Sequence, residues 1–326
     1  MNSIKKMMLS GALGCLISGM AYADGSSPQP VKPYWQDIQV VAVNKEKPRS
    51  SFMSYADRET ALTSRFEKSP YYSLLNGTWK FFFVDSYKDL PQNITDPSVN
   101  TSSWDDITVP GNWEVQGHGV AIYTNHGYEF KPRNPQPPLL PEANPVGVYR
   151  RDIEIPANWD NRDIYLHIGG AKSGLYVYLN GKEVGYSEDS KNPAEFLINK
   201  YLQPGKNVLT LKIFRWSTGS YLECQDFWRM SGIERDVFLW SQPKASIQDF
   251  RVVSTLDDTY TNGIFKLAVD LKNHTQETKN LNVGYELLDA KGNLVASEAN
   301  DIWVSPASPQ TASFEYDLKN VAPWTN

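Results

Sequence analysis

The spacing of short alternating segments constrains the fold of this chain more than any other feature. Apolar and polar residues alternate in short runs, and turn signals such as Asn180-Gly181 and Pro204-Gly205 separate them. No run with a helical period lies between two such segments, although a parallel sheet requires a crossover helix there. The best short helix candidate, Asp57–Phe66, comes before them and has Ala61, Leu62 and Phe66 at helical spacing. We therefore predict an all-β, antiparallel sandwich of the jelly-roll type. Its predicted strands include Trp79–Val84, Val146–Ile155, Asp163–Ile168, Gly174–Leu179, Glu183–Tyr186, Val208–Phe214 and Val237–Trp240.

A second series of strands begins where the pattern changes, around Ser241 to Ile247. Its strands recur about every ten residues, which predicts an immunoglobulin-like sandwich without the cysteine pair of antibody domains. We expect residues 24–245 to form the first domain and residues 246–326 the second, with only about six strands before Asn326. The predicted strands are Asp249–Ser254, Ile264–Lys272, Leu281–Leu288, Leu294–Glu298 and Ala312–Leu318.

The N-terminus predicts export. Met1 to Ala23 has the order of a secretory signal peptide: two lysines, an apolar run, and a small-x-small cleavage site ending at Ala23. The apolar run is too short to remain as a membrane span. The mature protein is expected in the periplasm, secreted, or at the cell surface. Loss of Cys15 with the signal peptide would leave Cys224 without a disulfide partner within the chain.

The charge balance argues against two classes of partner. Without the two lysines of the signal peptide the chain has 30 basic and 37 acidic residues, a net charge of about −7. Nucleic acid and anionic lipid are both bound through an excess of basic groups. We therefore expect binding of neither nucleic acid nor anionic lipid; the expectation of no membrane span rests on the shortness of the apolar run.

One long loop carries most of the candidate chemistry. Phe214 to Asp236 contains three large rings (Trp216, Tyr221 and Trp228) among several carboxylates and arginines. Aromatic faces can cover the C–H face of a sugar, and a carboxylate accepts bonds from two neighbouring hydroxyls. In the alternative interpretation, the rings belong to the core and the ion pairs only brace the loop. Residue types alone do not separate the two.

Candidate catalytic groups are few. Glu223 and Asp226 are close enough in sequence to form the carboxylate pair of a glycosidase, and Glu188, Asp189 and Glu195 form a second acidic cluster. Turn and capping roles are the alternative for all five. Cys224 has no histidine near it in sequence, and a lone cysteine is usually inert. The four scattered histidines predict no transition-metal site.

Several stretches, taken together, resemble a known family. They are Val109–Trp113, Ile122–Asn125, Asn144–Arg150, Asn180–Ser187, Asp189-Ser190 through Glu195-Phe196, and Arg215–Asp236. In this order they resemble the N-terminal part of a glycoside hydrolase family 2 enzyme of the large β-galactosidase type. The second domain resembles that family only in its strand pattern.

The resemblance implies a jelly-roll domain, then an immunoglobulin-like domain, then a TIM barrel that carries both catalytic glutamates. Asn125 and Asp226 match the residues that bind galactose hydroxyls in that family, and Asp226 matches a sodium ligand. His126 follows Asn125 at a position that lines the same subsite, but a histidine there departs from the family. Magnesium is expected only in the barrel, which this chain lacks.

We therefore expect the N-terminal portion of an exported, retaining β-galactosidase that binds β-galactosides through Asn125, Asp226 and His126. No catalytic residue is expected in the chain, which we interpret as truncated and inactive alone. The alternatives are a free-standing carbohydrate-binding or structural sandwich, and a family 2 β-glucuronidase or β-mannosidase. The sequence leaves open whether the full-length enzyme is a homo-oligomer.

Overall fold

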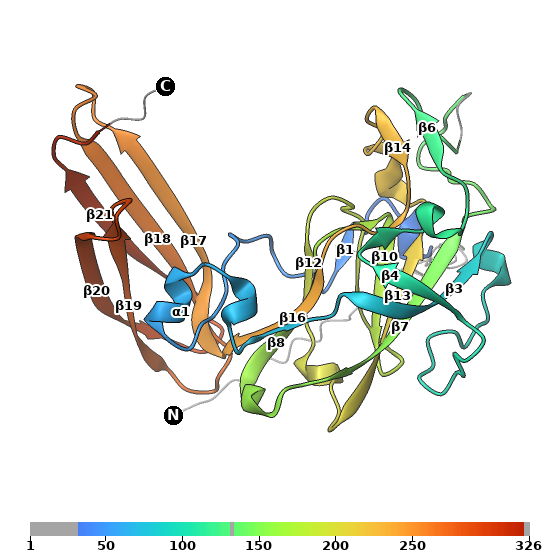
Figure 1. The fold of residues 1–326 in the computed structure, drawn as a ribbon, viewed down its shortest axis with the longest axis horizontal. Coiled ribbons are helices and arrows are strands. Elements are labelled where there is room, and N and C mark those ends of the chain that lie inside the picture. Colours follow the sequence, from blue (N-terminus) through green and yellow to red (C-terminus); the bar gives the residue numbers. More distant parts are fainter. Residues whose placement is uncertain (1–31, 131–133, 323–326) are drawn as a thin grey trace, which may run out of the picture. The chain divides into compact units, whose positions relative to one another are not determined.

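The computed structural model describes residues 32–130 and 134–322 (Figure 1). The predicted signal peptide, Met1–Ala23, lies outside the described residues. Within the described ranges the structure is built almost entirely of strands, and no helix there is long and apolar enough to cross a bilayer. Residues 32–130 and 134–322 contain one α-helix, α1 (Arg58–Leu62), and the 3₁₀ turns Tyr34–Gln36, Phe66–Lys68, Tyr87–Asp89, Glu114–Gln116, Ala157–Trp159, Asn199–Tyr201 and Thr218–Tyr221.

Two antiparallel sheets form the first sandwich, which confirms the predicted all-β class. The larger sheet has the order β1 (Ala42–Val43), β11 (Lys182–Ser187), β10 (Gly174–Leu179), β13 (Lys206–Phe214), β7 (Val146–Glu154), β3 (Gly77–Val84) and β4 (Asp105–Val109). The smaller sheet has the order β12 (Ala194–Leu197), β8 (Arg162–Ile168), β16 (Val237–Pro243) and β2 (Tyr72–Leu74). Three short strands join in a further small sheet: β5 (Gly111–Asn112), β15 (Gly232–Ile233) and β9 (Ala171–Lys172).

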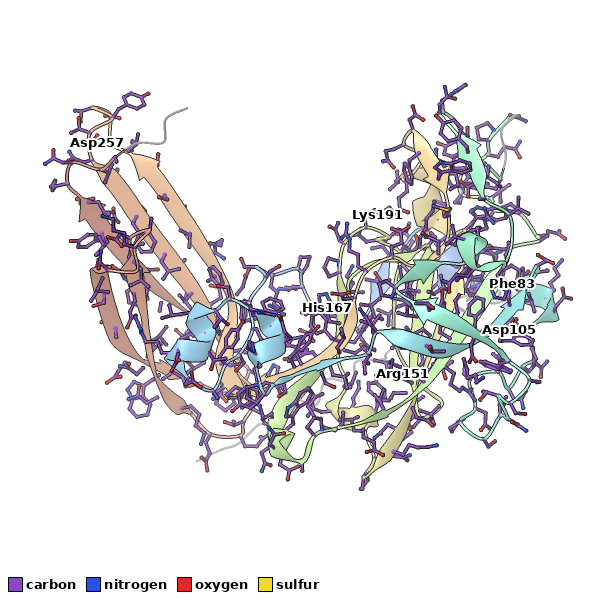
Figure 2. All side chains as sticks on the ribbon, in the orientation of Figure 1. Phe83, Asp105, Arg151, His167, Lys191 and Asp257 are labelled. Atoms are coloured by element: carbon purple, nitrogen blue, oxygen red, sulfur yellow. The ribbon has the colours of Figure 1, made fainter. Side chains whose placement is uncertain are left out.

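Alternation along the strands places the core between these sheets. Ile164, Leu166 and Ile168 of β8 are buried in the main apolar cluster with side chains of β10, β13 and β7. Tyr165 packs on the opposite face of the same strand, in a smaller cluster with Trp240. Successive side chains of a strand point to opposite faces, so each strand serves both layers. The side chains of both sheets fill the space between them (Figure 2).

The predicted hairpin at Asn180-Gly181 is confirmed. Both residues have positive φ, 52° and 77°, as a two-residue type I′ turn requires. The Asn180 side chain also joins neighbouring segments, since its Oδ1 accepts from the Val208 backbone N–H at 2.9 Å and its Nδ2 donates to Tyr201 O at 3.0 Å. The turn therefore fixes the register of β10 and β11.

Gly185 in β11 allows a close approach that any side chain would block. A Cβ at this position would lie 2.3 Å from Val43 O and 2.6 Å from a ring carbon of Phe196. We expect Gly185→Ala to destabilise the chain by about 2 kcal/mol, because backbone and a packed ring must both move. Thermal unfolding followed by circular dichroism measures this. Gly263→Ala is the control, because its Cβ would lie no closer than 3.1 Å to Val321 and Leu318 and would meet side-chain atoms alone; an equal effect of both changes would contradict the account.

The predicted helix over Asp57–Phe66 is shorter than expected. Asp57 caps α1 by accepting from the Thr60 N–H at 2.8 Å, but the helix ends at Leu62. Ser64 then adopts a φ of 53°, a left-handed conformation that a helix interior excludes. A separate 3₁₀ turn, Phe66–Lys68, follows. Helical spacing of the apolar residues alone did not indicate this break.

The second sandwich pairs a three-stranded with a two-stranded sheet. Its core is formed by Phe265, Leu267, Val269, Leu271, Val283, Val304, Ala312 and Phe314. The described residues contain five strands in this part of the chain rather than about six, and each of the five is longer than predicted by at least two residues. The two sheets are β17 (Ala245–Leu256), β18 (Gly263–Asn273) and β21 (Gln310–Leu318), and β19 (Lys279–Leu288) with β20 (Leu294–Val304).

Candidate functional site

Asn125 and Asp226 meet at one end of a two-stranded ribbon. The ribbon pairs β6 (Ile122–Thr124) with β14 (Phe227–Arg229), and Thr124 lies opposite Phe227 (Figure 1). Asn125 directly follows Thr124 and Asp226 directly precedes Phe227, so the two residues face each other across the ribbon end. Both are exposed. The fold thus brings together two residues that are far apart in sequence.

Neighbouring side chains orient both groups. The Tyr123 hydroxyl donates to Asp226 Oδ1 at 2.9 Å, and this bond raises the pKa of the phenol, which keeps it a donor at neutral pH. His126 Nδ1 lies 2.7 Å from Asn125 Oδ1, where a protonated Nδ1 donates. The Asn125 amide nitrogen then serves as a donor and the Asp226 carboxylate as an acceptor. One donor and one acceptor side by side suit a ligand with neighbouring hydroxyls.

The rings of the long loop divide between core and surface. Trp216 donates through Nε1 to Glu129 Oε1 at 2.7 Å and packs on Phe130, and Tyr221 is buried against the same ring. The core interpretation therefore holds for these two. Trp228 is 54% exposed and meets Tyr123, itself 57% exposed, edge to face at a ring distance of 5.6 Å. Tyr123 of this exposed pair contacts Asp226 through its hydroxyl.

Two of the candidate carboxylates hold the loop in place. Glu223 accepts from the backbone N–H and the hydroxyl of Ser190 at 2.9 and 2.5 Å. Glu188 is buried and accepts from Tyr186, Thr218 and the Gly219 N–H, while its burial raises the pKa of the carboxyl. Internal donors occupy both groups. Each carboxylate accepts from a backbone N–H of a neighbouring segment, as the alternative of a capping role predicts.

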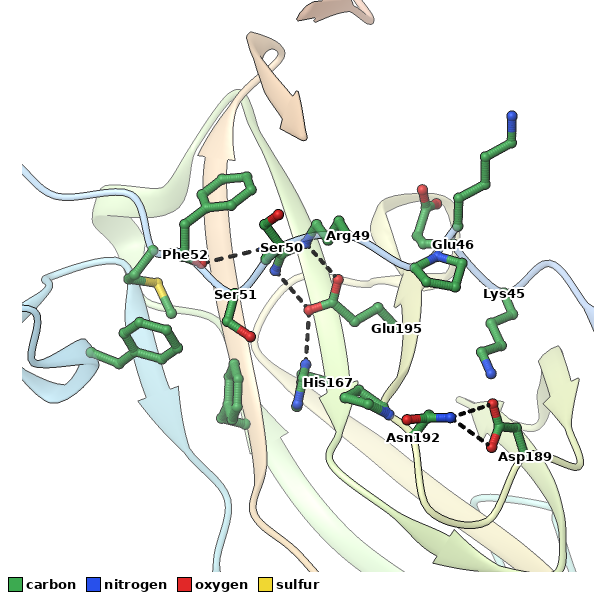
Figure 3. Close-up of a pocket in the computed structure, with 16 residues that line it drawn as sticks. Lys45, Glu46, Arg49, Ser50, Ser51, Phe52, His167, Asp189, Asn192 and Glu195 are labelled. Atoms are coloured by element: carbon green, nitrogen blue, oxygen red, sulfur yellow. Dashed lines mark hydrogen bonds and ion pairs between the residues drawn. The ribbon is translucent and has the colours of Figure 1, made fainter. Parts of the chain in front are cut away.

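A cavity of about 340 Å³ lies away from the ribbon, beside the segment Lys45–Met53 (Figure 3). Glu195 lines it and accepts from Arg49 and His167, and Asp189 accepts from the amide of Asn192. Glu195 thus belongs to a buried network, whereas Asp189 is exposed and makes only a local contact three residues along the chain. No residue of the ribbon lines this cavity.

The remaining reactive side chains are partly exposed and each contacts a neighbouring group. The Cys224 thiol lies 3.9 Å from Tyr221 O, His118 packs on the Phe81 ring, and His274 contacts Asp163 at 2.7 Å. Among residues 32–130 and 134–322, no group of three or more His, Cys, Asp and Glu side chains could hold a metal ion.

Sequence reasoning missed two buried acids beneath the ribbon, Glu114 and Glu129. They face Arg215 and Arg229, which are also buried. The sequence indicates ion pairs only within the loop itself, whereas these two acids precede it by about a hundred residues. One feature of the sequence could have indicated these acids: two arginines in a loop rich in apolar rings require buried counter-charges.

Family comparison assigns both sandwiches. Residues 72–243 match the model described as "Glycosyl hydrolases family 2, sugar binding domain", and residues 245–326 match "Glycosyl hydrolases family 2". A β-galactosidase of Priestia megaterium is 37% identical over 90% of this chain and 29% of the relative. A β-galactosidase of Halalkalibacterium halodurans is 39% identical over 80% of this chain and 26% of the relative.

Solved structures agree at the level of the fold. A β-glucuronidase of Bacteroides uniformis superposes with a TM-score of 0.63 at 20% identity, over 78% of this chain and 28% of that one. The chain spans less than a third of the length of these relatives.

Proposed function

Since the chain belongs to glycosyl hydrolase family 2, we propose that it forms the substrate-binding N-terminal portion of an exported β-galactosidase. The observation that carries this proposal is the meeting of Asn125 and Asp226 at the ribbon end. They would bind hydroxyls of a terminal β-linked galactose, with His126 beside them. Whether the enzyme is an oligomer is left open.

The chain alone is proposed to be inactive. Glycoside hydrolysis requires two carboxylates that flank the bond, one as acid and one as nucleophile or base. In the described residues Glu188, Glu195 and Glu223 are held by internal donors, and Asp226 faces outward from a ribbon. The chain's own contribution is to orient the sugar, while the bond is broken by carboxylates of a further domain.

A sodium ion fits Asp226 only in part. Hard cations take oxygen ligands, and the Asp226 carboxylate keeps acceptor capacity beyond its bond from Tyr123. The described residues provide no cluster of acidic groups around it. Asp226 would therefore supply one ligand, and the others would come from the sugar, from water or from another domain.

A galactose specificity is favoured over a glucuronide. The relatives that align over most of this chain at 37–39% identity are β-galactosidases. The β-glucuronidase similarity is at 20% identity and concerns the fold alone.

A chimera tests the proposal. In the chimera, residues 24–326 replace the matching part of the Priestia megaterium β-galactosidase. Its hydrolysis of a chromogenic β-galactoside and of a chromogenic β-glucuronide is measured. Two controls are measured on the same substrates: residues 24–326 alone, and the relative without its matching part. We expect β-galactoside hydrolysis by the chimera only. Turnover by the chain alone, or a correctly folded chimera that hydrolyses only the glucuronide or neither substrate, would contradict the proposal.

Tyr123→Phe in this chimera is expected to lower kcat/KM for the β-galactoside by about threefold. The change removes only the hydroxyl that orients Asp226, and an exposed hydrogen bond contributes about 0.5–1 kcal/mol. Tyr260→Phe, at an exposed tyrosine in the turn between β17 and β18, is the control. A Tyr123→Phe chimera with unchanged kinetics would show that Asp226 needs no such support.

A further inference from the structure

Four buried charged residues lie beneath the ribbon: Arg215, Arg229, Glu114 and Glu129. We propose that this ion cluster positions Asn125 and Asp226, with Arg229 as its central residue. The side chains of all four are at most 6% exposed, and the buried Lys172 also interacts with the charges of Glu114 and Glu129. The inference rests on the proposed function, since it concerns how the same substrate-binding residues are held.

The arginines hold the β6 side of the ribbon through its backbone. Arg229 Nη2 donates to Thr124 O at 3.4 Å, directly before Asn125. Arg215 Nη2 donates to Val120 O at 2.9 Å, just before β6 begins. The first strand is therefore fixed at both ends by buried guanidinium groups.

The same residues hold the β14 side. Arg229 Nη1 donates to Glu223 O at 3.1 Å, in the turn that leads to Asp226. Arg215 Nη2 donates to Arg229 O at 3.3 Å, and the Glu114 carboxylate accepts from the Ser231 N–H at 2.9 Å just beyond the ribbon. One guanidinium, that of Arg229, thus contacts the segments that carry both site residues.

The acids keep the arginines in place. Glu129 lies 3.4 Å from Arg229 Nε and 3.8 Å from Arg215 Nε, and Glu114 lies 3.4 Å from Arg215 Nη1. Neither Nε makes a hydrogen bond, so these contacts are charge pairs only. Glu129 is itself fixed by the bond from Trp216. This arrangement explains why Trp216 is half-buried, with its ring nitrogen bonded to Glu129, instead of being offered to a sugar.

Arginine is required at position 229 because of its shape. Its planar fork reaches Thr124 O and Glu223 O from two different nitrogens, whereas a single lysine ammonium keeps the charge but cannot span both. Arg229 does not contact the ribbon-end groups of Asn125 or Asp226 in any described interaction. It is a positioning residue that acts through the backbone.

Hydrogen exchange on residues 24–326 tests the structural half. We expect Arg229→Lys to speed amide exchange by about tenfold in residues 120–126 and 223–229, and not in β10 or β18. Arg251→Lys, at an exposed arginine paired with Asp270, is the control. If Arg229→Lys unfolds the chain, Glu129→Gln is used instead, because it removes a charge that holds Arg229 but retains an acceptor for Trp216. The same faster exchange in the two segments is then expected. Unchanged exchange in the two segments would overturn the proposal.

A double-mutant cycle in the chimera tests the functional half. Arg229→Lys is expected to lower kcat/KM for the β-galactoside by about tenfold, and to have little further effect when Asp226→Asn is already present. A residue that acts only on general stability would give additive effects. Additive effects would overturn the proposal. An Asp226→Asn chimera with unchanged activity would also overturn the proposal. If Arg229→Lys nevertheless speeds amide exchange in the two segments, the positioning by Arg229 stands and the proposed function of Asp226 is what fails.

Discussion

Glu195→Gln is expected to lower the free energy of unfolding of the first sandwich by about 3 kcal/mol at pH 7. Glu195 is buried, lines the cavity shown in Figure 3 and accepts four hydrogen bonds. Arg49 gives two through Nε and Nη2, both at 2.9 Å, His167 Nδ1 lies at 2.8 Å, and Trp240 Nε1 at 3.1 Å. Glutamine has the same shape but places an amide donor against these donors and leaves the Arg49 charge without its partner.

The effect depends on pH in a definite direction. Burial alone raises the pKa of the Glu195 carboxyl, but the hydrogen bond from His167 and the charge of Arg49 outweigh it, so the pKa lies below its usual value. A carboxyl with a lowered folded-state pKa stabilises the fold above its unfolded pKa, about 4.3 for glutamate. The stabilisation is then lost as the pH falls through the folded pKa. The difference between wild type and Glu195→Gln should therefore shrink below about pH 4.

Urea unfolding followed by tryptophan fluorescence measures this change, because eight of the ten tryptophans lie before residue 245. Glu154→Gln, at an exposed position at the end of β7, is the control and should change the free energy of unfolding by less than about 0.5 kcal/mol. A loss equal to that of the control at pH 7 would show that the Arg49–Glu195–His167 network does not stabilise this sheet.

Sequence patterns predicted the strands and turns whose conformation depends on residues near to one another in the chain. The alternation in β8 and the Asn-Gly turn before β11 specify which face is buried and where the chain reverses, and both are confirmed. The helix after Asp57 was predicted too long because Ser64 breaks it through a backbone conformation that its residue type does not announce.

The candidate site was less accessible from the sequence. The pairing of Asn125 with Asp226 came from the family resemblance, since no periodicity links two residues about a hundred positions apart. The roles of Trp216, Glu114 and Glu129 depend on contacts between distant segments. The rings and charges of the loop could equally well have faced a ligand or the core, and tertiary packing decided between them.

Asp226→Asn is expected to lower kcat/KM of the chimera for a β-galactoside by about 100-fold, or about 2.7 kcal/mol. The carboxylate is the acceptor at the ribbon end, and hydrogen bonds from sugar hydroxyls to a charged group are stronger than those to an amide. Asparagine also presents a donor where the Tyr123 hydroxyl already donates. The loss should appear mainly in KM if the group binds substrate and transition state alike.

The most direct test of the account is therefore the kcat/KM of three chimeras on one chromogenic β-galactoside: the unchanged chain, Asp226→Asn, and Asp258→Asn at an exposed acid of the second sandwich. We predict a loss of about 100-fold for Asp226→Asn and less than about twofold for Asp258→Asn. Equal activity of all three would contradict the claim that this chain contributes Asp226 to the substrate site.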